Sequence, residues 1–373
     1  MSPPGPLAGT FEPIAGADWP RQAVVVDDPA GTIIPAGADT LYTAVNRLLA
    51  DGRTVARVPE TGDIFIAHTQ VDRAALAALA DELTLPTVEV AEAPKSTRAI
   101  RAQRIGLFKP WVASMDEGWT RWVLEQYDFP MVNLSNEQIR SGEFTGSVDV
   151  LLFPDVESGI ISKVVPEDND YRGRFVPLPP EYSGGIDEWK SDEDQPENGK
   201  KTKAAPVAKP TKGGERIKKW VEGGGTVVAL DSSADYFIDL FELPVTNVLA
   251  DLKPDAFLCP GSTLRVEVDT THPLGWGMRA EEAIYFADSP AFKTSVPDPR
   301  FDREVVVRYP EHVRDILLSG YLEGGEILER RAAVVEYRVG EGRVVLIGFR
   351  SQHRGQPLRT FKLLFNALYE VVD

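Results

Sequence analysis

The residues best suited to chemistry are polar side chains that each follow a predicted strand. They are Lys109 and Trp111, Asp155, Asp231 with Ser232 and Ser233, and Arg350 with His353 and Arg354. In an open sheet of parallel strands, ligands bind beyond the carboxyl ends of the strands, so we expect these side chains to meet at one edge. Two arginines, one histidine and helix N-termini at such an edge would suit a carboxylate, for instance a peptide C-terminus.

A simpler interpretation of the same charges needs no ligand. Arg350 and Arg354 can form structural ion pairs with Asp155 or Asp231, because paired charges near strand ends are common. We favour these ion pairs, and the carboxylate site remains the alternative.

The elements that must position these residues alternate regularly from about residue 98 onward. Strands are predicted at Arg104–Lys109, Pro130–Leu134, Val148–Pro154, Thr226–Leu230 and Gly342–Gly348. Helical spacing of apolar residues follows Ser114, surrounds Trp220, covers Ser233–Phe241 and recurs in the last segment, from Phe361 to Leu368. This alternation is typical of an α/β fold with a doubly wound, mainly parallel sheet.

A small α+β domain is predicted before this sheet, over residues 22–97. Its expected order is β-α-β-β-α-β, with strands at Ala23–Asp28, Thr54–Pro59, Asp63–Ala67 and Thr87–Glu92. Residues 1–21 are rich in proline and glycine, and residues 190–212 are rich in charge. Neither segment can bury enough apolar surface to fold, so we expect a disordered N-terminus and a disordered insertion within a domain of residues 98–373.

The overall composition excludes several classes of partner. A chain of 373 residues with a net charge of -17 lacks the clustered positive charge that nucleic acids require. It contains no apolar run of about 18 residues, so we expect neither a transmembrane helix nor a membrane partner. The first residues lack the basic and apolar regions of a signal peptide, and the compartment stays undetermined.

Three segments resemble, in this order, the C-terminal region of large bacterial zinc carboxypeptidases of the carboxypeptidase A type. They are RIGLFKPWVASMDEGWTRW at 104–122, VEGGGTVVALDS at 221–232 and GFRSQHRGQP at 348–357. In such proteins this region follows the peptidase domain and looks like a class I glutamine amidotransferase domain, which is flavodoxin-like. The resemblance covers most of residues 22–373, and these relatives look exported.

The zinc site of such carboxypeptidases needs a His-x-x-Glu pair and a distant histidine. None of the four histidines, His68, His272, His312 and His353, is followed by glutamate three residues later. We therefore expect no metal and no cofactor. The resemblance implies that a zinc-peptidase domain, or another protein domain, is the partner.

The amidotransferase comparison also lacks its catalytic residues. Such enzymes use a cysteine on a sharp strand-to-helix turn and a histidine after a late strand. The turn here reads Asp231-Ser232-Ser233, and the single cysteine, Cys259, lies well beyond it. His353 stands where the histidine is expected, but Gly355 replaces the acidic residue. The resemblance therefore implies a non-catalytic accessory module for docking or for binding a peptide or anion.

Two alternatives remain open. One is a serine-type amidohydrolase in which Ser232 or Ser233 acts with His353, which requires a hydroxyl within about 3.2 Å of the imidazole. The non-catalytic interpretation of these serines, which also applies to Ser114, is that each is a helix N-cap. The other is that the chain would be classed as a zinc carboxypeptidase only because its full-length relatives are such enzymes.

A pair of tryptophans gives a further indication. At helical spacing, Trp119 and Trp122 are expected in the core or at a domain interface. If exposed, they would mark a docking surface for another domain.

Overall fold

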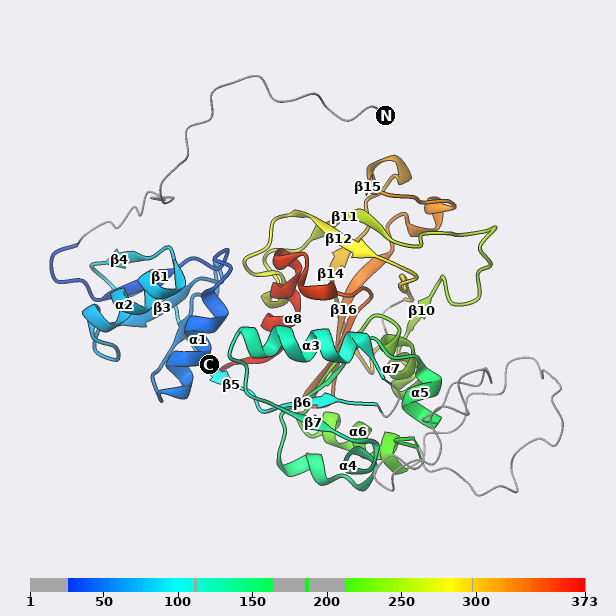
Figure 1. Ribbon diagram of the computed structural model, residues 1–373, viewed down its shortest axis with the longest axis horizontal. Coiled ribbons are helices and arrows are strands. Elements are labelled where there is room, and N and C mark those ends of the chain that lie inside the picture. Colours follow the sequence, from blue (N-terminus) through cyan, green and yellow to red (C-terminus); the bar gives the residue numbers. More distant parts are fainter. Residues whose placement is uncertain (1–25, 111–112, 164–184, 188–211, 297, 373) are drawn as a thin grey trace.

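The computed structural model describes residues 26–110, 113–163, 185–187, 212–296 and 298–372 (Figure 1). The predicted disordered N-terminus, Trp111, and residues 190–211 of the predicted insertion lie outside the described residues. Position 212 already belongs to a helix, so the insertion as predicted extends one residue too far.

The first sheet is antiparallel and contains six strands in the order β18-β5-β2-β3-β1-β4. Four strands come from the N-terminal segment: β1 (Gly31–Ile34), β2 (Ala56–Arg57), β3 (Ile64–Ala67) and β4 (Val88–Val90), with helices α1 (Leu41–Ala50) and α2 (Arg73–Leu83) between them. Two strands come from beyond residue 97: β5 (Arg98–Ala102) and β18 (Tyr369–Val372). The last described strand, β18, therefore pairs with β5 at the edge of the first sheet.

The first predicted strand, Ala23–Asp28, is wrong for the residues that the structure describes. Asp28 adopts a left-handed φ of 51°, which an extended strand does not allow. Pro29 has no amide hydrogen to donate to a neighbouring strand. The ladder with β3 therefore begins at Gly31.

The second sheet contains a run of five parallel strands in the order β7-β6-β8-β9-β17. Their bounds are β6 (Ile105–Phe108), β7 (Met131–Leu134), β8 (Val150–Phe153), β9 (Thr226–Leu230) and β17 (Gly342–Ile347). Numbered along the chain, the order is 2-1-3-4-5, which is one of the common doubly wound orders.

Antiparallel strands continue this sheet beyond β17, so it is mixed and not mainly parallel. They follow in the order β16 (Ala332–Val339), β14 (Asp302–Arg308), β11 (Ser262–Val268) and β12 (Glu281–Phe286). Three short strands lie off this path: β10 (Val245–Asn247), β13 (Phe292–Thr294) and β15 (Leu317–Ser319). The short turn at Gly340 and Glu341 joins β16 to β17 as an antiparallel hairpin.

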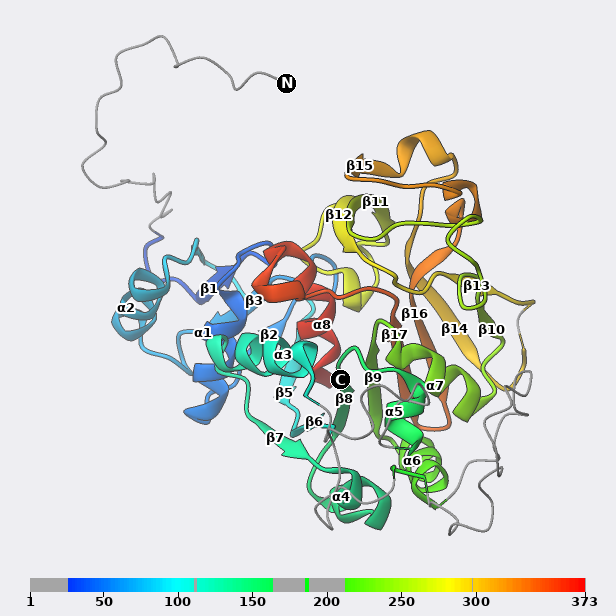
Figure 2. The same ribbon diagram turned by 45° about the vertical axis from the view of Figure 1, so that its right-hand side comes forward.

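Helices cover both faces of the parallel strands, as Figure 2 shows for α3 and α7. Helices α3 (Met115–Gln126) and α8 (Phe361–Ala367) pack on the face that carries Leu107, Leu152 and Leu230. The opposite face carries Phe153 and Leu346. It is covered by α4 (Asn136–Ser141), α5 (Ser158–Lys163), α6 (Lys212–Glu222) and α7 (Ser233–Phe241). Because both faces are buried, the carboxyl ends of these strands are where their polar groups can meet.

Buried polar side chains join the first sheet to α8. The Tyr42 hydroxyl donates to Asn366 Oδ1 at 2.9 Å. The Asn366 amide donates to the carbonyls of Leu274 and Trp276 at 3.1 and 3.0 Å. The Tyr369 hydroxyl donates to Asn46 Oδ1 at 2.6 Å. Among the described helices, none has the length and apolar character needed to cross a membrane.

Candidate functional site

The sharp turn between β9 and α7 is occupied by Asp231. Its backbone has a φ of 52°, a left-handed conformation that aspartate tolerates better than most residues. Its amide donates to the carbonyl of Ile347 at 2.7 Å, so the turn lies beside the carboxyl end of β17. The side chain is buried. The turn therefore presents a carboxyl group into the protein at the carboxyl edge of the sheet.

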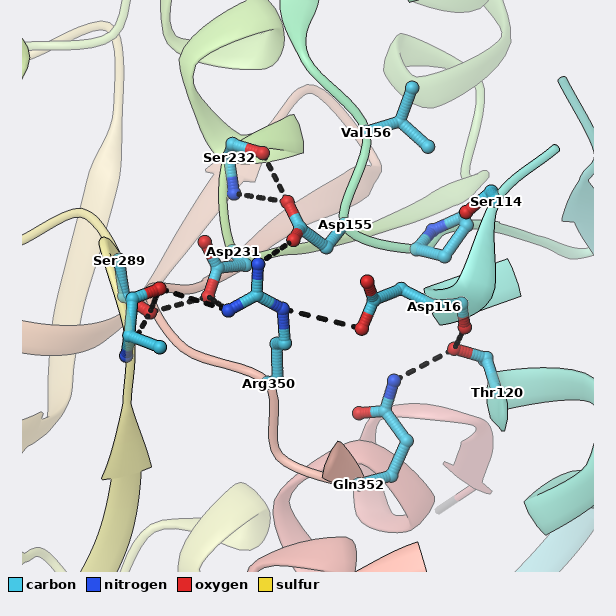
Figure 3. A network of polar contacts seen from close by, with 12 residues as sticks. Ser114, Asp116, Thr120, Asp155, Val156, Asp231, Ser232, Ser289, Arg350 and Gln352 are labelled. Atoms are coloured by element: carbon cyan, nitrogen blue, oxygen red, sulfur yellow. Dashed lines mark hydrogen bonds and ion pairs between the residues drawn. The ribbon is translucent and has the colours of Figure 1, made fainter. Parts of the chain in front are cut away.

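Arg350, which follows β17, lies among three carboxyl groups (Figure 3). Its Nε lies 3.3 Å from Asp116 Oδ1, in the first turn of α3. Its Nη2 donates to Asp155, which follows β8. Its Nη1 lies 3.8 Å from Asp231 Oδ2 and donates to the carbonyl of Ala287 at 2.9 Å. Each nitrogen of this guanidinium therefore faces an acceptor of the protein itself.

One guanidinium cannot neutralise three ionised carboxylates, and the pKa directions reflect this. Burial raises the pKa of Asp231 well above its ordinary value; Asp155 adds to the rise and Arg350 opposes it. Burial also raises the pKa of Asp116. Burial alone would lower the pKa of Arg350, but the three acids raise it instead. Asp231 is the most buried of the three acids, and burial is the largest cause of the rise in its pKa.

An outer layer of hydrogen bonds holds this cluster in place. The Ser289 hydroxyl donates to Asp231 Oδ2 at 2.5 Å. The Gln352 amide donates to the Thr120 hydroxyl at 2.7 Å, and that hydroxyl donates to the carbonyl of Asp116 at 2.6 Å. Sequence reasoning missed Asp116, Ser289 and Gln352. Only Asp116 carried a signal, as an acid in the first turn of a predicted helix.

The two candidate serines have structural partners. The Ser232 hydroxyl donates to Asp155, and its amide donates to the same oxygen at 3.3 Å. The Ser233 hydroxyl is buried, donates to the carbonyl of Pro154 and accepts from the Val156 amide at 3.1 Å. Among the described residues, no hydrogen bond joins either serine to His353.

The N-cap interpretation is right for Ser114 and wrong for Ser232 and Ser233. The Ser114 hydroxyl accepts from the Glu117 amide at 3.0 Å. Ser232 stands at the N-cap position of α7, but its side chain forms no capping bond. Its φ and ψ of -63° and -18° are already helical, and Asp155 accepts its hydroxyl proton. Ser233 is the first residue of α7 and lies inside the helix.

His353 lies outside the Arg350 cluster. Its ring stacks on Tyr285 with centroids 4.0 Å apart, and its Nδ1 is buried without a hydrogen-bond partner among the described residues. Burial, followed by Arg350 and Arg354, lowers its pKa, so the imidazole stays neutral around pH 7. Of the other candidates, Arg354 and Lys109 are exposed. Within the described part of the chain, Arg354 forms no ion pair with Asp155 or Asp231.

The structure therefore brings together Asp155, Asp231 and Arg350 from the set of predicted site residues. Arg350 forms the ion pairs of the simpler interpretation, so binding a carboxylate ligand there would require it to give up protein partners. The remaining candidate nucleophile, Cys259, is buried, and burial raises the pKa of its thiol. A buried thiol with a raised pKa is a poor nucleophile.

One group of side chains has the composition of a metal site. Single ligand atoms of His272, Glu304 and Glu336 lie within 4.8 Å of one another. However, His272 Nδ1 accepts from the Leu274 amide at 3.1 Å, so its proton belongs on Nε2, which donates to Glu304 at 2.8 Å. A metal at Nε2 would need the lone pair that this proton occupies. The group fits a hydrogen-bonded histidine better than a metal ligand.

The exposed face of α3 carries apolar side chains. Trp119 and Trp122 pack edge to face with ring centroids 5.6 Å apart. Trp122 is 45% exposed and Met115, on the same face of the helix, is 63% exposed. The expectation of a core position is therefore wrong for Trp122.

Comparisons with known proteins identify no family. No protein-family model matches the chain, and no curated protein matches its sequence. Among solved structures, a ThuA-like protein from Bacteroides uniformis is 12% identical, with 74% of this chain and 92% of that chain covered and a TM-score of 0.38. A cytoplasmic protein from Salmonella typhimurium is 14% identical over 71% and 97% of the two chains, with a TM-score of 0.39. A β-galactosidase from Bacillus circulans is 11% identical over 73% and 31%, with a TM-score of 0.36. None of these three is a carboxypeptidase, and similarity at this level assigns no activity.

Proposed function

We propose that the chain is a non-catalytic accessory module on a class I glutamine amidotransferase-like, flavodoxin-like framework. The 2-1-3-4-5 order of the parallel strands supports this framework. The observation that carries the proposal is the residue at the turn between β9 and α7. Where such a framework would hold its nucleophile, this chain has Asp231, buried and hydrogen-bonded to Ser289.

The chemistry of this turn argues against hydrolysis. A nucleophile must reach the substrate, lose its proton and have a base beside it. Asp231 is buried, and burial raises its pKa, which opposes the loss of its proton. The Ser232 hydroxyl is engaged with Asp155, while His353 stacks on Tyr285. The polar groups at this edge satisfy one another and contribute to stability.

The test is a hydrolysis assay of the purified chain on amide, peptide and ester substrates. Wild type and the variants Ser232→Ala, Ser233→Ala and His353→Ala are compared, with circular dichroism to verify folding. We expect no turnover above buffer for any of the four proteins. Turnover by the wild type that Ser232→Ala or His353→Ala abolishes without unfolding would establish the serine-type amidohydrolase instead.

We further propose that the module docks to another protein domain through the docking face, defined as Met115, Trp119 and Trp122 on α3. Exposed tryptophan and methionine are the side chains that binding interfaces favour. The zinc-peptidase domain is the partner that the sequence resemblance predicts, and none of the comparisons adds support for it.

Docking is tested by titrating the chain with a purified zinc-peptidase domain of the carboxypeptidase A type. We expect Trp122→Arg to weaken binding by at least about tenfold, because a tryptophan that becomes buried in an interface is a frequent hot spot. Val132→Arg is the control, since Val132 is also an exposed apolar residue but lies on β7. Equal binding by Trp122→Arg and wild type would show that this face of α3 is not part of the interface. Absence of binding by the wild type would exclude this partner.

A further inference from the structure

A cavity of about 650 Å³ lies at the opposite edge of the parallel strands, between the two sheets. It opens where β8, β9 and β17 begin, beside Asp149, Thr226 and Gly342. Its walls contain six arginines and only three acids. In a chain whose net charge is -17, this is a local concentration of positive charge.

The most buried arginine of the cavity, Arg57, forms no direct ion pair among the described residues, although Tyr42 and, from further away, Asp63 favour its charged form. Its side chain is 1% exposed, and among the described residues no carboxylate lies within ion-pair distance of it. Nη1 donates to the carbonyl of Gly62 at 2.7 Å and Nη2 to Asn366 Oδ1 at 3.5 Å, while Nε has no partner. Burying an unpaired charge costs several kcal/mol, so an unpaired guanidinium here requires an explanation.

A second buried donor of the cavity is also without a partner. Trp276 is 6% exposed, and its Nε1 has no acceptor among the described residues. The Arg57 Cζ lies 5.3 Å from the centroid of this ring. Gly62 allows the arrangement, because it has a φ of 74° and a Cβ there would lie 2.4 Å from the ring. The fold therefore holds two unsatisfied donors side by side in one cavity.

Four of the other arginines of the cavity, Arg101, Arg104, Arg338 and Arg343, differ from Arg57 because they have carboxylate partners. Arg104 lies 2.7 Å from Asp149, Arg343 lies 3.4 Å from Glu336, and Arg101 pairs with Glu370. The side chains of Arg101 and Arg104 are more than half exposed. Arg101 and Arg104 therefore form an outer rim of the cavity. Arg57 is the buried arginine that still lacks a negatively charged acceptor.

We propose that this cavity binds the oxyanion of a small molecule, a carboxylate or a phosphate, with Arg57 and Trp276 as its principal donors. Both side chains offer only N–H groups, so only an acceptor satisfies them. A water molecule would accept a hydrogen bond but would leave the guanidinium charge unbalanced. An oxyanion accepts hydrogen bonds and also balances the charge. The site is independent of the function proposed for the carboxyl edge.

The test measures thermal unfolding of the full chain with inorganic phosphate, with citrate, and with chloride at matched ionic strength. A ligand that binds only the folded state raises the unfolding midpoint. We expect phosphate or citrate to raise it beyond chloride, and the stronger of the two identifies the oxyanion class. If neither exceeds chloride, the proposal is overturned.

Two variants assign the effect to the cavity. Arg57→Met keeps an unbranched apolar chain as far as the position of Nε and removes the buried charge. We therefore expect an unliganded protein at least as stable as wild type that no longer responds to the anion. Trp276→Phe keeps the ring and removes the N–H, and we expect about tenfold weaker binding by calorimetric titration. Arg314→Met is the control, because its side chain is 79% exposed and does not line the cavity.

The result is decisive even if Arg57→Met does not fold. An undiminished anion response in Trp276→Phe would then contradict the assignment, and a tenfold loss would support it. A folded Arg57→Met protein that keeps the full response would also overturn the proposal, since the anion would then bind elsewhere.

Discussion

At the scale of single residues, Arg350 holds together groups that would otherwise repel one another. It lies between Asp116, Asp155 and Asp231, which come from three different elements. Removing one partner of a buried ion pair leaves the other uncompensated, which costs more than the pair itself contributes. The structural role of Arg350 therefore gives it a large effect on stability.

We predict that Arg350→Met lowers the free energy of unfolding by about 3 kcal/mol or more. Urea denaturation measures the change, with Arg314→Met as an exposed arginine expected to lie within about 0.5 kcal/mol of wild type. Adding Asp231→Asn to Arg350→Met should recover part of the loss, because it removes one of the repelling acids. A loss for Arg350→Met no larger than for Arg314→Met would contradict this role.

The residues of the site that could be predicted from the sequence are those that lie directly after the ends of parallel strands. Asp155, Asp231 and Arg350 each come directly after a parallel strand, so the general position of ligand sites in such sheets brought them together. Ser289 could not be predicted, because it follows β12 and reaches Asp231 only through the antiparallel extension of the sheet. His353 and Arg354 also follow β17, but they lie outside the cluster, because the His353 ring stacks on Tyr285 and Arg354 is exposed.

A second acid, Asp235 in the first turn of α7, gives a prediction with a defined pH window. Burial raises its pKa to about 6, and a hydrogen bond from Asn247 opposes the rise. The folded state therefore binds a proton that the unfolded state has lost at the same pH. The stability from this group is fully present below the ordinary pKa of about 4 and is lost as the pH rises to about 6.

We predict that Asp235→Asn is as stable as wild type near pH 4 and more stable above pH 6, with the difference opening between these values. Urea denaturation across this range measures it. Asp51→Asn, at the exposed C-cap of α1, is the control and should show no such opening. A constant difference at every pH would show that Asp235 does not titrate in this window.

At the scale of elements, local signals predicted the helices and strands better than their partners. The predicted bounds of β9 and α7 agree with the structure, because an apolar strand, a turn and an amphipathic helix are each encoded locally. The partner of a strand depends on residues far away in the sequence. Neither the pairing of β14 with β16 nor the pairing of β18 with β5 has a local signal.

The start of α3 provides a direct test of a local signal. We predict that Ser114→Ala lowers the free energy of unfolding by about 1 kcal/mol, because the Glu117 amide loses its acceptor. Ser114→Asp should retain most of the stability, since aspartate caps helices equally well. Urea denaturation of both variants is the measurement, and equal losses for alanine and aspartate would show that the hydroxyl is not acting as a cap.

At the scale of the whole molecule, the two sheets are joined by buried hydrogen bonds around α8. Asn366 has the central position, since it accepts from Tyr42 and donates to the carbonyls of Leu274 and Trp276. These groups belong to segments far apart in the sequence. A change at Asn366 should therefore affect both sheets together.

We predict that Asn366→Ala lowers the free energy of unfolding by about 3 kcal/mol or more, because it leaves several buried polar groups without partners. Thermal unfolding followed by calorimetry measures the loss and shows whether the sheets still unfold in one transition. Asn133→Ala, at an exposed position of β7, should be nearly neutral. A neutral Asn366→Ala would mean that packing alone joins the sheets.

The pairing of β18 with β5 also constrains how the protein is made. During synthesis the N-terminal part of a chain emerges from the ribosome first and ordinarily begins to fold first. Here β5 lacks one neighbour until residues 369–372 have been translated, and Asn46 lacks the Tyr369 hydroxyl until then. The nascent chain therefore exposes an unpaired strand edge from the synthesis of β5 until residues 369–372 emerge, which is the period when a chaperone would protect it best.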